Sequence, residues 1–305
     1  MSRMIGVDRI RAAAERARPH VLRTPMVPVE GALLKLECLQ PTGSFKVRGF
    51  FATALALEPE TLRRGIITVS AGNAAQACAY VAKTLGVPCR VFMYDTAPPL
   101  KLEGVKRWGA TPVLMSRDAI LEWMAKEGWT SEPETFIHPF AEPAVMAGHG
   151  GLGLELLEDV PDLARVLVPV GGGGLIGGIA SAIKGLRPHV EVIGVQSDGY
   201  ASWTRSLAAG SPVSIKPDTI ADGTTAPTDP RMLELLRECV DRWLTVPEPR
   251  LRSAIPELAS GAKVVAEGAG ALAYAALEQL EPGLPTVAVV SGGNIDPKVL
   301  ANLLS

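Results

Sequence analysis

Short apolar runs alternate with amphipathic stretches along most of this chain, and turns rich in glycine or proline separate them. In the first half, three runs are typical of buried strands: GIITVS at 65–70, VPCRVFMY at 87–94 and TPVLM at 111–115. A helical pattern follows each of them, at 74–86, 98–109 and 117–128. This alternation predicts an α/β fold of mostly parallel, twisted sheets flanked by helices.

The same alternation returns in the second half of the chain. Strand patterns occur in ARVLVPV at 164–170, VEVIGVQ at 190–196 and TVAVVSGGN at 286–294, and the helix LIGGIASAIKGL follows the first of them. Helix and strand patterns are weakest at 129–145 and 197–230, which we expect to be connecting or loop-rich. Near the N-terminus an amphipathic helix is expected, with Ile5, Ile10, Ala13 and Ala14 roughly on one face.

Composition narrows the class of protein. The chain has 305 residues, of which 47% are hydrophobic and 20% charged, and this suits a compact protein of two domains. A net charge of −2 and the lack of a basic stripe argue against nucleic acid as a partner. No apolar run approaches the length of about 20 residues that spans a membrane, so no membrane partner is expected.

The cysteines and the N-terminus point to a compartment. Cys38, Cys78, Cys89 and Cys239 form no CxxC pair and have neither zinc-site nor disulfide-framework spacing, so we expect free thiols. The N-terminus is too polar for a signal peptide, and its acidic residues argue against a transit peptide. The protein is therefore expected to be cytoplasmic.

Three glycine-containing loops follow predicted strands: SAGN at 70–73, GGGG at 171–174 and SGGN at 291–294. Ligands of parallel sheets bind at the carboxyl ends of strands, so these loops are expected to meet in one crevice. Serine and asparagine in SAGN and SGGN are equally typical of helix N-caps. The three loops together favour a binding site.

The tetraglycine loop is expected to hold a phosphate. Its backbone N–H groups can approach an anion without side-chain obstruction, and the following helix adds a favourable dipole. No Lys-Ser/Thr follows, so it is not a nucleotide P-loop. Gly172, Gly174 and Gly177 also satisfy GxGxxG, with Asp198 just beyond the next strand. An NAD-binding dehydrogenase therefore stays a remote alternative.

Lys46 lies in QPTGSFKVRGF at 40–50. Most lysines are solvated charges, but this one follows aromatic Phe45 and a run of small residues. A lysine in a low-dielectric cleft has a lowered pKa and can form a Schiff base. A reactive lysine together with a phosphate loop indicates pyridoxal 5'-phosphate as cofactor.

Five segments carry a family resemblance, in this order: KLECLQPTGSFKVRGF (35–50), VSAGNAAQ (69–76), VGGGGL (170–175), TIADG (219–223) and SGGNID (291–296). Together they resemble the threonine/serine dehydratases, or ammonia-lyases. These form a branch of the fold-type II pyridoxal-phosphate enzymes, with a tryptophan synthase β-like fold, that also contains serine racemase. The likeness covers nearly the whole chain.

The resemblance implies a two-domain architecture and an assembly. A small mobile domain, 60–145, would be inserted into a large cofactor-binding domain made from 1–59 and 146–305. The site would lie in the cleft between the two domains. Relatives are commonly dimers or tetramers, so a homodimer or homotetramer is expected.

The resemblance also assigns roles to residues. Lys46 would carry the cofactor and act as general base, and Phe45 would pack near its ring. Asn73 would meet its phenolic oxygen and Ser291 its pyridine nitrogen. Backbone N–H groups would bind two anionic groups. The cofactor phosphate would be bound by those of Gly171, Gly172, Gly173, Gly174 and Leu175. The substrate carboxylate would be bound by those of Ser70, Ala71, Gly72 and Asn73.

The reaction implied is α,β-elimination from a small-molecule amino acid, L-threonine or L-serine or a bulkier β-substituted serine, to a 2-oxo acid and ammonia. Serine racemase has a second hydroxyl at the position of Ala71. A methyl group cannot move a proton, so racemisation is disfavoured here. A neutral serine at the pyridine nitrogen further favours elimination over reprotonation.

Several residues depart from the family pattern. Gln196 and Ser202 stand where cation-dependent members have acids, so no metal is expected, although Asp198 could supply a shifted ligand. Ala74 replaces a histidine, which opens space for a larger substrate. His149 replaces a glutamine, and it either lines the pocket or is a hydrogen-bonded structural histidine.

Other activities stay open. Threonine synthase uses a similar lysine run, but aspartate commonly follows the lysine where Val47 stands. Another β/γ-replacement enzyme, an amino-acid racemase and a non-catalytic carrier are further alternatives. Tyr200 and Trp203 either shape the mouth of the site or pack in the core.

Overall fold

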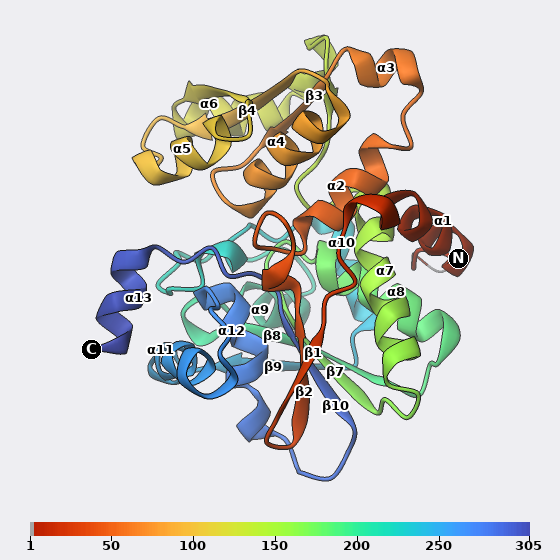
Figure 1. Cartoon of the computed structure of the whole chain (residues 1–305), viewed down its shortest axis with the longest axis vertical. Helices are drawn as coiled ribbons and strands as arrows, with labels where there is room; N and C mark the ends of the chain where they lie inside the picture. The colour runs from red at the N-terminus through yellow and green to blue at the C-terminus, as the bar shows by residue number, and fades with distance from the viewer. Residues whose placement is uncertain (1–2) are drawn as a thin grey trace.

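The computed structural model describes residues 3–305, which contain two sheets flanked by helices (Figure 1). The smaller sheet has four parallel strands in the order β5-β4-β3-β6. They are β3 (Ile66–Val69), β4 (Cys89–Tyr94), β5 (Thr111–Met115) and β6 (Thr135–Phe136). The strands predicted at 65–70, 87–94 and 111–115 are confirmed within a residue or two.

The larger sheet has six strands in the order β1-β2-β10-β7-β8-β9. They are β1 (Met26–Val29), β2 (Ala32–Leu36), β7 (Arg165–Pro169), β8 (Glu191–Ser197), β9 (Arg242–Val246) and β10 (Thr286–Val290). Only β1 and β2 pair antiparallel in this sheet. Because β2 lies beside β10, strands from near the two ends of the chain are neighbours in one sheet (Figure 1).

Helices cover both faces of the larger sheet, as its apolar strands require. On β7, Val166 and Val168 join one core cluster while Leu167, between them, joins the other. The first cluster includes side chains of α1 (Val7–Ala17), α2 (Lys46–Ala54), α7 (Pro143–Asp159), α8 (Gly174–Leu186) and α10 (Pro230–Cys239). The second includes those of α11 (Glu248–Glu257), α12 (Gly268–Ala275) and α13 (Pro297–Leu304).

The remaining helices are short or belong to the smaller sheet. Against that sheet lie α4 (Asn73–Leu85), α5 (Pro99–Lys106) and α6 (Arg117–Ala125), and α3 (Pro59–Arg63) and α9 (Ser202–Ala209) are short. Single turns are η1 (Arg18–His20), η2 (Glu37–Leu39), η3 (Gly128–Ser131), η4 (Asp198–Tyr200), η5 (Asp222–Thr224), η6 (Leu258–Ala262) and η7 (Leu277–Gln279).

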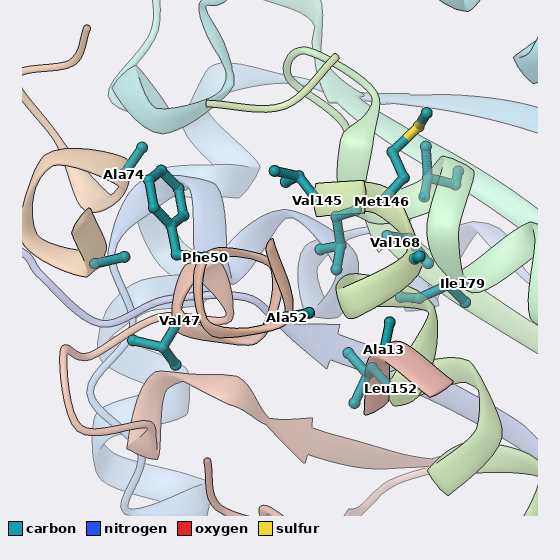
Figure 2. Packing of buried hydrophobic residues seen from close by; sticks show 14 of the residues in the cluster. Ala13, Val47, Phe50, Ala52, Ala74, Val145, Met146, Leu152, Val168 and Ile179 are labelled. Carbon is teal, nitrogen blue, oxygen red and sulfur yellow. The ribbon is translucent and has the colours of Figure 1, made fainter. Parts of the chain in front are cut away.

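Helix α2 packs closely on α7, and this contact holds the helix that carries Lys46. Phe50 and Ala52 of α2 lie in the same apolar cluster as Val145 of α7 (Figure 2). A Cβ on Gly148 would lie 2.6 Å from the Cβ of Ala52, so only glycine permits this approach. The first residue of α2 is Lys46, which the packing therefore holds in place.

The structure differs from the sequence prediction in four places. The segment 197–230 is not wholly loop, because α9 forms around fully buried Trp203. The helices expected to reach 109 and 128 end earlier, at Lys106 and Ala125. Ile5 is buried but precedes α1, whose buried residues are Ile10, Ala13 and Ala17.

Other expectations about the chain as a whole can be compared with residues 3–305. All four cysteines are free, as predicted. Within those residues no helix is both long and apolar enough to cross a bilayer. The smaller sheet is built from 66–136, inside the small domain expected at 60–145, whose boundaries and mobility stay predictions.

Candidate active site

The lysine loop and two of the glycine loops are joined by hydrogen bonds. The N–H of Phe45 donates to the Ser291 carbonyl (3.1 Å), and the N–H of Gly293 donates to the Gly43 carbonyl (2.9 Å). The SAGN loop joins them through Asn294, whose Nδ2 donates to Asn73 Oδ1 (2.8 Å). Segments far apart in sequence therefore form one site at the carboxyl ends of β3 and β10.

The tetraglycine loop lies between β7 and the 13-residue helix α8. Gly173 has φ +87°, a conformation that favours glycine. Within the described residues no acceptor is found for the N–H groups of Gly172, Gly173 and Gly174. These free donors at a helix N-terminus can bind an anion, because the helix dipole adds to them.

Phe140 connects the tetraglycine loop with the lysine. A Cβ on Gly172 would lie 2.3 Å from the Phe140 ring, so that ring covers the loop directly. The preceding residue, Pro139, accepts a hydrogen bond of 2.6 Å from Lys46 Nζ through its carbonyl. The lysine amine and the anion-binding loop therefore share the turn at Pro139 and Phe140.

Lys46 is half-buried, and within the described residues its amine has a carbonyl partner but no carboxylate partner. Its Nζ lies 5.0 Å from the centroid of the Phe45 ring. Burial desolvates the ammonium and lowers the pKa of Lys46 to about 8. A substantial fraction of the amine is therefore neutral near physiological pH, as a nucleophile or general base requires.

Asn73, at the start of α4, is held by two partners. Its Nδ2 donates to Glu267 Oε1 (2.6 Å), and its Oδ1 accepts from Asn294. Burial raises the pKa of Glu267 to about 7, although the Asn73 hydrogen bond opposes this. A Cβ on Gly292 would lie 2.2 Å from Glu267 Oε1, so the SGGN glycine makes room for the carboxyl group.

The other predicted site residues lie around the same loops. Ser291 is buried, and its Oγ makes only a 3.4 Å contact with the Ala269 carbonyl, which leaves its hydroxyl available. Leu175 is buried as the second residue of α8. In the SAGN loop the N–H of Gly72 already donates to Ser70 Oγ (3.0 Å), and the half-buried Ala71 presents only a methyl group.

His149 is not a hydrogen-bonded structural histidine, so that alternative is wrong. Its ring is fully buried, and neither nitrogen has a partner in the described chain. It packs edge-on against Phe45, with ring centroids 4.8 Å apart. Burial lowers the pKa of His149 well below its usual value, so the ring stays neutral and supports Phe45 from behind.

Trp203 belongs to the core and also contacts the site. It is fully buried, and its indole N–H donates to the Gly171 carbonyl (2.5 Å). Tyr200 is buried too, and its hydroxyl donates to the Ala226 carbonyl (3.3 Å). The prediction that these residues pack in the core is therefore confirmed for both, and Trp203 also forms a hydrogen bond to the glycine loop.

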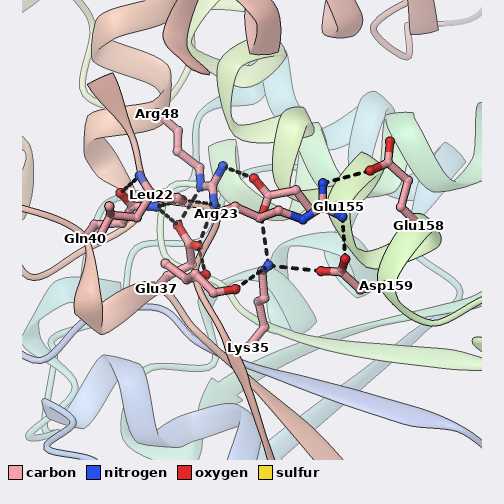
Figure 3. A network of polar contacts seen from close by, with 10 residues as sticks. Leu22, Arg23, Lys35, Glu37, Gln40, Arg48, Glu155, Glu158 and Asp159 are labelled. Carbon is pink, nitrogen blue, oxygen red and sulfur yellow. Dashed lines mark hydrogen bonds and ion pairs between the residues drawn. The ribbon is translucent and has the colours of Figure 1, made fainter. Parts of the chain in front are cut away.

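Arg48, two residues after Lys46, has a different environment (Figure 3). Its guanidinium donates to Glu37 (2.7 Å) and Glu155 (2.7 Å), both buried or nearly so. Fully buried Lys35 also contacts Glu155, at 2.7 Å. Every buried charge in this cluster has a counter-charge, which makes the cluster structural.

Known proteins resemble this chain over nearly its whole length. Residues 17–292 match the family described as pyridoxal-phosphate dependent enzyme. An L-threonine ammonia-lyase of Geobacter sulfurreducens is 39% identical, over 98% of this chain and 78% of its own. Among solved structures, maize serine racemase has a TM-score of 0.91 at 31% identity, covering 97% of this chain and 96% of its own. A threonine deaminase from T.th. has a TM-score of 0.88 at 37% identity, covering 95% and 99%.

The chain belongs to the pyridoxal-phosphate-dependent enzymes, and its fold is that of fold type II. The resemblance inferred from the sequence is confirmed, and so is the cofactor class. The residues present fit pyridoxal phosphate. Free N–H groups on the tetraglycine loop suit its phosphate, and the uncompensated Lys46 amine suits its aldehyde.

Sequence reasoning missed three groups that the structure places at the site. Glu267 opens the EGAG run at 267–270, where an acid before a helix resembles an ordinary cap. Pro139 contributes a carbonyl oxygen, which no side-chain pattern reveals. The Thr224 Cα lies where a Cβ on Gly171 would come within 2.9 Å of it, and this approach depends on how two distant loops pack.

Proposed function

We propose that this chain is a threonine/serine ammonia-lyase. It converts a β-hydroxy amino acid to a 2-oxo acid and ammonia by α,β-elimination. The observation that supports this most is a lysine amine, with its pKa lowered to about 8, beside a loop of free N–H groups. The relatives named L-threonine ammonia-lyase support the same reaction class.

In this proposal Gly171 to Gly174 and Leu175 bind the cofactor phosphate through backbone N–H groups. Asn73 and Ser291 orient its ring from two sides, and Phe45 packs beside it. The loop Ser70–Asn73 binds the substrate carboxylate through the N–H groups of Ala71 and Asn73, because those of Ser70 and Gly72 already donate to the Phe92 carbonyl and to Ser70 Oγ. When bound, pyridoxal phosphate supplies a conjugated ring that accepts the electron pair left at the α-carbon.

Lys46 Nζ takes the α-proton in this proposal, because it is the site's amine with a lowered pKa. The Pro139 carbonyl accepts a hydrogen bond from Nζ and so fixes the direction of the amine. The methyl group of Ala71 offers no second acid or base, so a proton removed by Lys46 is not replaced on the other face. Elimination is therefore proposed over racemisation.

Purified protein with L-threonine and L-serine should release 2-oxo acid and ammonia in equal amounts, and Lys46→Ala should release neither. Ala74 replaces a histidine of the family, and on that ground a β-substituted serine larger than threonine should show a higher kcat/KM than serine, although the Ala74 methyl group itself packs in the apolar core. Turnover of phosphohomoserine, or of O-acetylserine with sulfide, without 2-oxo acid would instead support a replacement enzyme.

Assembly, domain motion and location are parts of the same proposal. We propose a homodimer or homotetramer in the cytoplasm, whose segment 60–145 closes over the bound substrate. The free cysteines agree with a reducing compartment. Light scattering of the purified protein tests the assembly directly.

A further inference from the structure

The side chain of Gln196 is fully buried at the end of β8 and uses both ends of its carboxamide. Its Nε2 lies 3.4 Å from the Val170 carbonyl oxygen, 3.3 Å from the Tyr200 carbonyl oxygen and 3.3 Å from Ser202 Oγ. Its Oε1 accepts from the N–H groups of Trp203 (3.0 Å) and Thr204 (3.3 Å). Oxygens face one end and N–H donors the other, so these partners fix which end is nitrogen.

Three oxygen atoms therefore converge on one nitrogen inside the protein. Buried oxygens that face each other need a donor or a cation between them. Hard divalent cations bind oxygens at about 2.0–2.6 Å and favour carboxylates among the ligands. Here all three oxygens are neutral, and the amide nitrogen already lies between them.

Asp198 does not supply a substitute ligand. Its side chain is exposed, and Gln196 and Ser202 are bonded to each other instead. Among residues 3–305 no group of three His, Cys, Asp or Glu side chains is placed to hold a metal. The donor set around Gln196 does not fit a divalent cation.

The contacts of Gln196 lead directly to the tetraglycine loop. Val170, whose carbonyl accepts from Nε2, immediately precedes Gly171. Trp203, whose N–H donates to Oε1, also donates its indole N–H to the Gly171 carbonyl. The Trp203 ring stacks on Trp243, with centroids 6.3 Å apart, so it is fixed in the core. Gln196 thus holds both the residue before the loop and the side chain that bonds its first carbonyl.

We propose that the Gln196 carboxamide replaces a divalent cation as the permanent centre of this oxygen cluster, and that it positions the Gly171–Gly174 loop for a phosphate. Gln196 touches neither cofactor nor substrate, so it is a positioning residue. The inference rests on the phosphate role proposed for the loop. It does not depend on which amino acid is the substrate.

The test compares the wild type with Gln196→Met, Gln196→Glu and Trp203→Phe, and with Gln279→Glu as a matched charge control on the surface. Cofactor-free protein is titrated with pyridoxal phosphate and, separately, with pyridoxal, which lacks the phosphate. Each titration and a thermal unfolding curve are recorded in EDTA and in millimolar Mg²⁺ or Ca²⁺.

We expect the wild type and Gln279→Glu to give the same Kd and Tm with and without cation. Gln196→Met and Trp203→Phe should bind pyridoxal phosphate roughly tenfold more weakly, as the loss of one or two buried hydrogen bonds predicts, while their affinity for pyridoxal stays unchanged. Gln196→Glu places a carboxylate against three oxygens, so its Kd and Tm should worsen in EDTA and recover with cation.

The proposal is overturned if cation raises the Tm or the cofactor affinity of the wild type. It is also overturned if Gln196→Met and Trp203→Phe bind pyridoxal phosphate as the wild type does, or lose both ligands equally. If Gln196→Glu does not fold, the wild-type and Trp203→Phe measurements still decide. A protein that passes these tests but eliminates no amino acid refutes the proposed activity alone.

Discussion

Helix α2 carries two basic side chains two residues apart, and their surroundings differ in one respect. Arg48 has two carboxylates at 2.7 Å, whereas Lys46 has only a carbonyl oxygen. Burial would raise the pKa of Glu37, but Arg48 outweighs burial and holds that pKa below its usual value. For Lys46 nothing opposes burial, and its pKa falls to about 8.

The difference shows how one short segment serves both stability and chemistry. A buried cation with counter-charges stays charged at every physiological pH and joins α2 to α7 and to the segment after β2 (Figure 3). A desolvated cation without counter-charge gives up its proton readily and becomes a reagent. Replacing each group in turn should therefore affect different properties.

The largest effect is expected from Lys46→Ala. Loss of the amine should lower kcat by a factor on the order of 10³ or more, because both the cofactor anchor and the general base disappear. The free energy of unfolding should change little, since no ion pair is lost. Borohydride should fix the cofactor to the wild type and to the exposed control Lys298→Ala, but not to Lys46→Ala. If the wild type and Lys46→Ala had identical absorption spectra, both before and after reduction, Lys46 would not be the anchor.

Arg48→Met should instead lower the free energy of unfolding. It leaves the Glu37 carboxylate buried without its cation, which costs about 3–5 kcal/mol of stability. Urea unfolding measures this, with Arg63→Met in the exposed Glu60 pair as a control that should lose about 1 kcal/mol or less. Since the folded-state pKa of Glu37 is lowered, its contribution is present at neutral pH and disappears on acidification. A loss for Arg48→Met no larger than that of the control would contradict the structural role of this cluster.

The sequence predicts the fold well because apolar runs of strand length recur along the chain. Strands such as GIITVS and VPCRVFMY are bounded by glycine and proline, so their limits are visible. Helix α9 is not visible, because it has only eight residues and forms around the buried Trp203. Tertiary packing decides such a short helix, and no local pattern contains that information.

The same distinction applies to the candidate active site, where some residues are predictable from local sequence and others are not. The glycine loops and Lys46 are predictable, because unusual backbone freedom and an unusual neighbourhood appear in the local sequence. Glu267 and the Pro139 carbonyl lie far from Asn73 and Lys46 in the chain, and only the folded structure brings them together. Whether a buried lysine is a reagent or a structural cation depends on counter-charges from other segments. For Lys35 and Arg48 these include Glu155, more than 100 positions away.

Glu267 is the acidic counterpart of Lys46, a buried charge without a close cation, and Glu267→Gln tests it. Burial, with the charge of Asp222, raises its pKa to about 7, while Asn73 and the more distant Lys101 lower it. A raised pKa means that the folded protein keeps this proton to a higher pH than the unfolded chain does, so stability falls as the pH rises from about 5 to 7. The cost at neutral pH is about 3 kcal/mol, and a glutamine in place of Glu267 would avoid it while still accepting from Asn73.

Cofactor-free wild type and Glu267→Gln should therefore differ more in free energy of unfolding at about pH 8 than at about pH 5. The variant should be the more stable at the higher pH. Exposed Glu278→Gln, which removes an acid from a surface pair, is the matched control and should show no such trend. A difference between wild type and Glu267→Gln that is independent of pH would show that Glu267 ionises as an ordinary carboxyl group.

The smallest effect on stability is expected from an exposed ion pair. Lys101 of α5 contacts Asp222 of η5 at 2.9 Å and so links the smaller sheet to the larger one. Such a pair contributes about 1 kcal/mol or less, and less in high salt, so Lys101→Ala should barely change stability. The two partners act on Glu267 in opposite directions, however, because Lys101 lowers its pKa and Asp222 raises it. Lys101→Ala should shift the pH-dependent loss of stability to higher pH, and Asp222→Asn should shift it to lower pH. Shifts in the same direction would mean that the two variants act by loosening the contact between α5 and η5, and not through their charges.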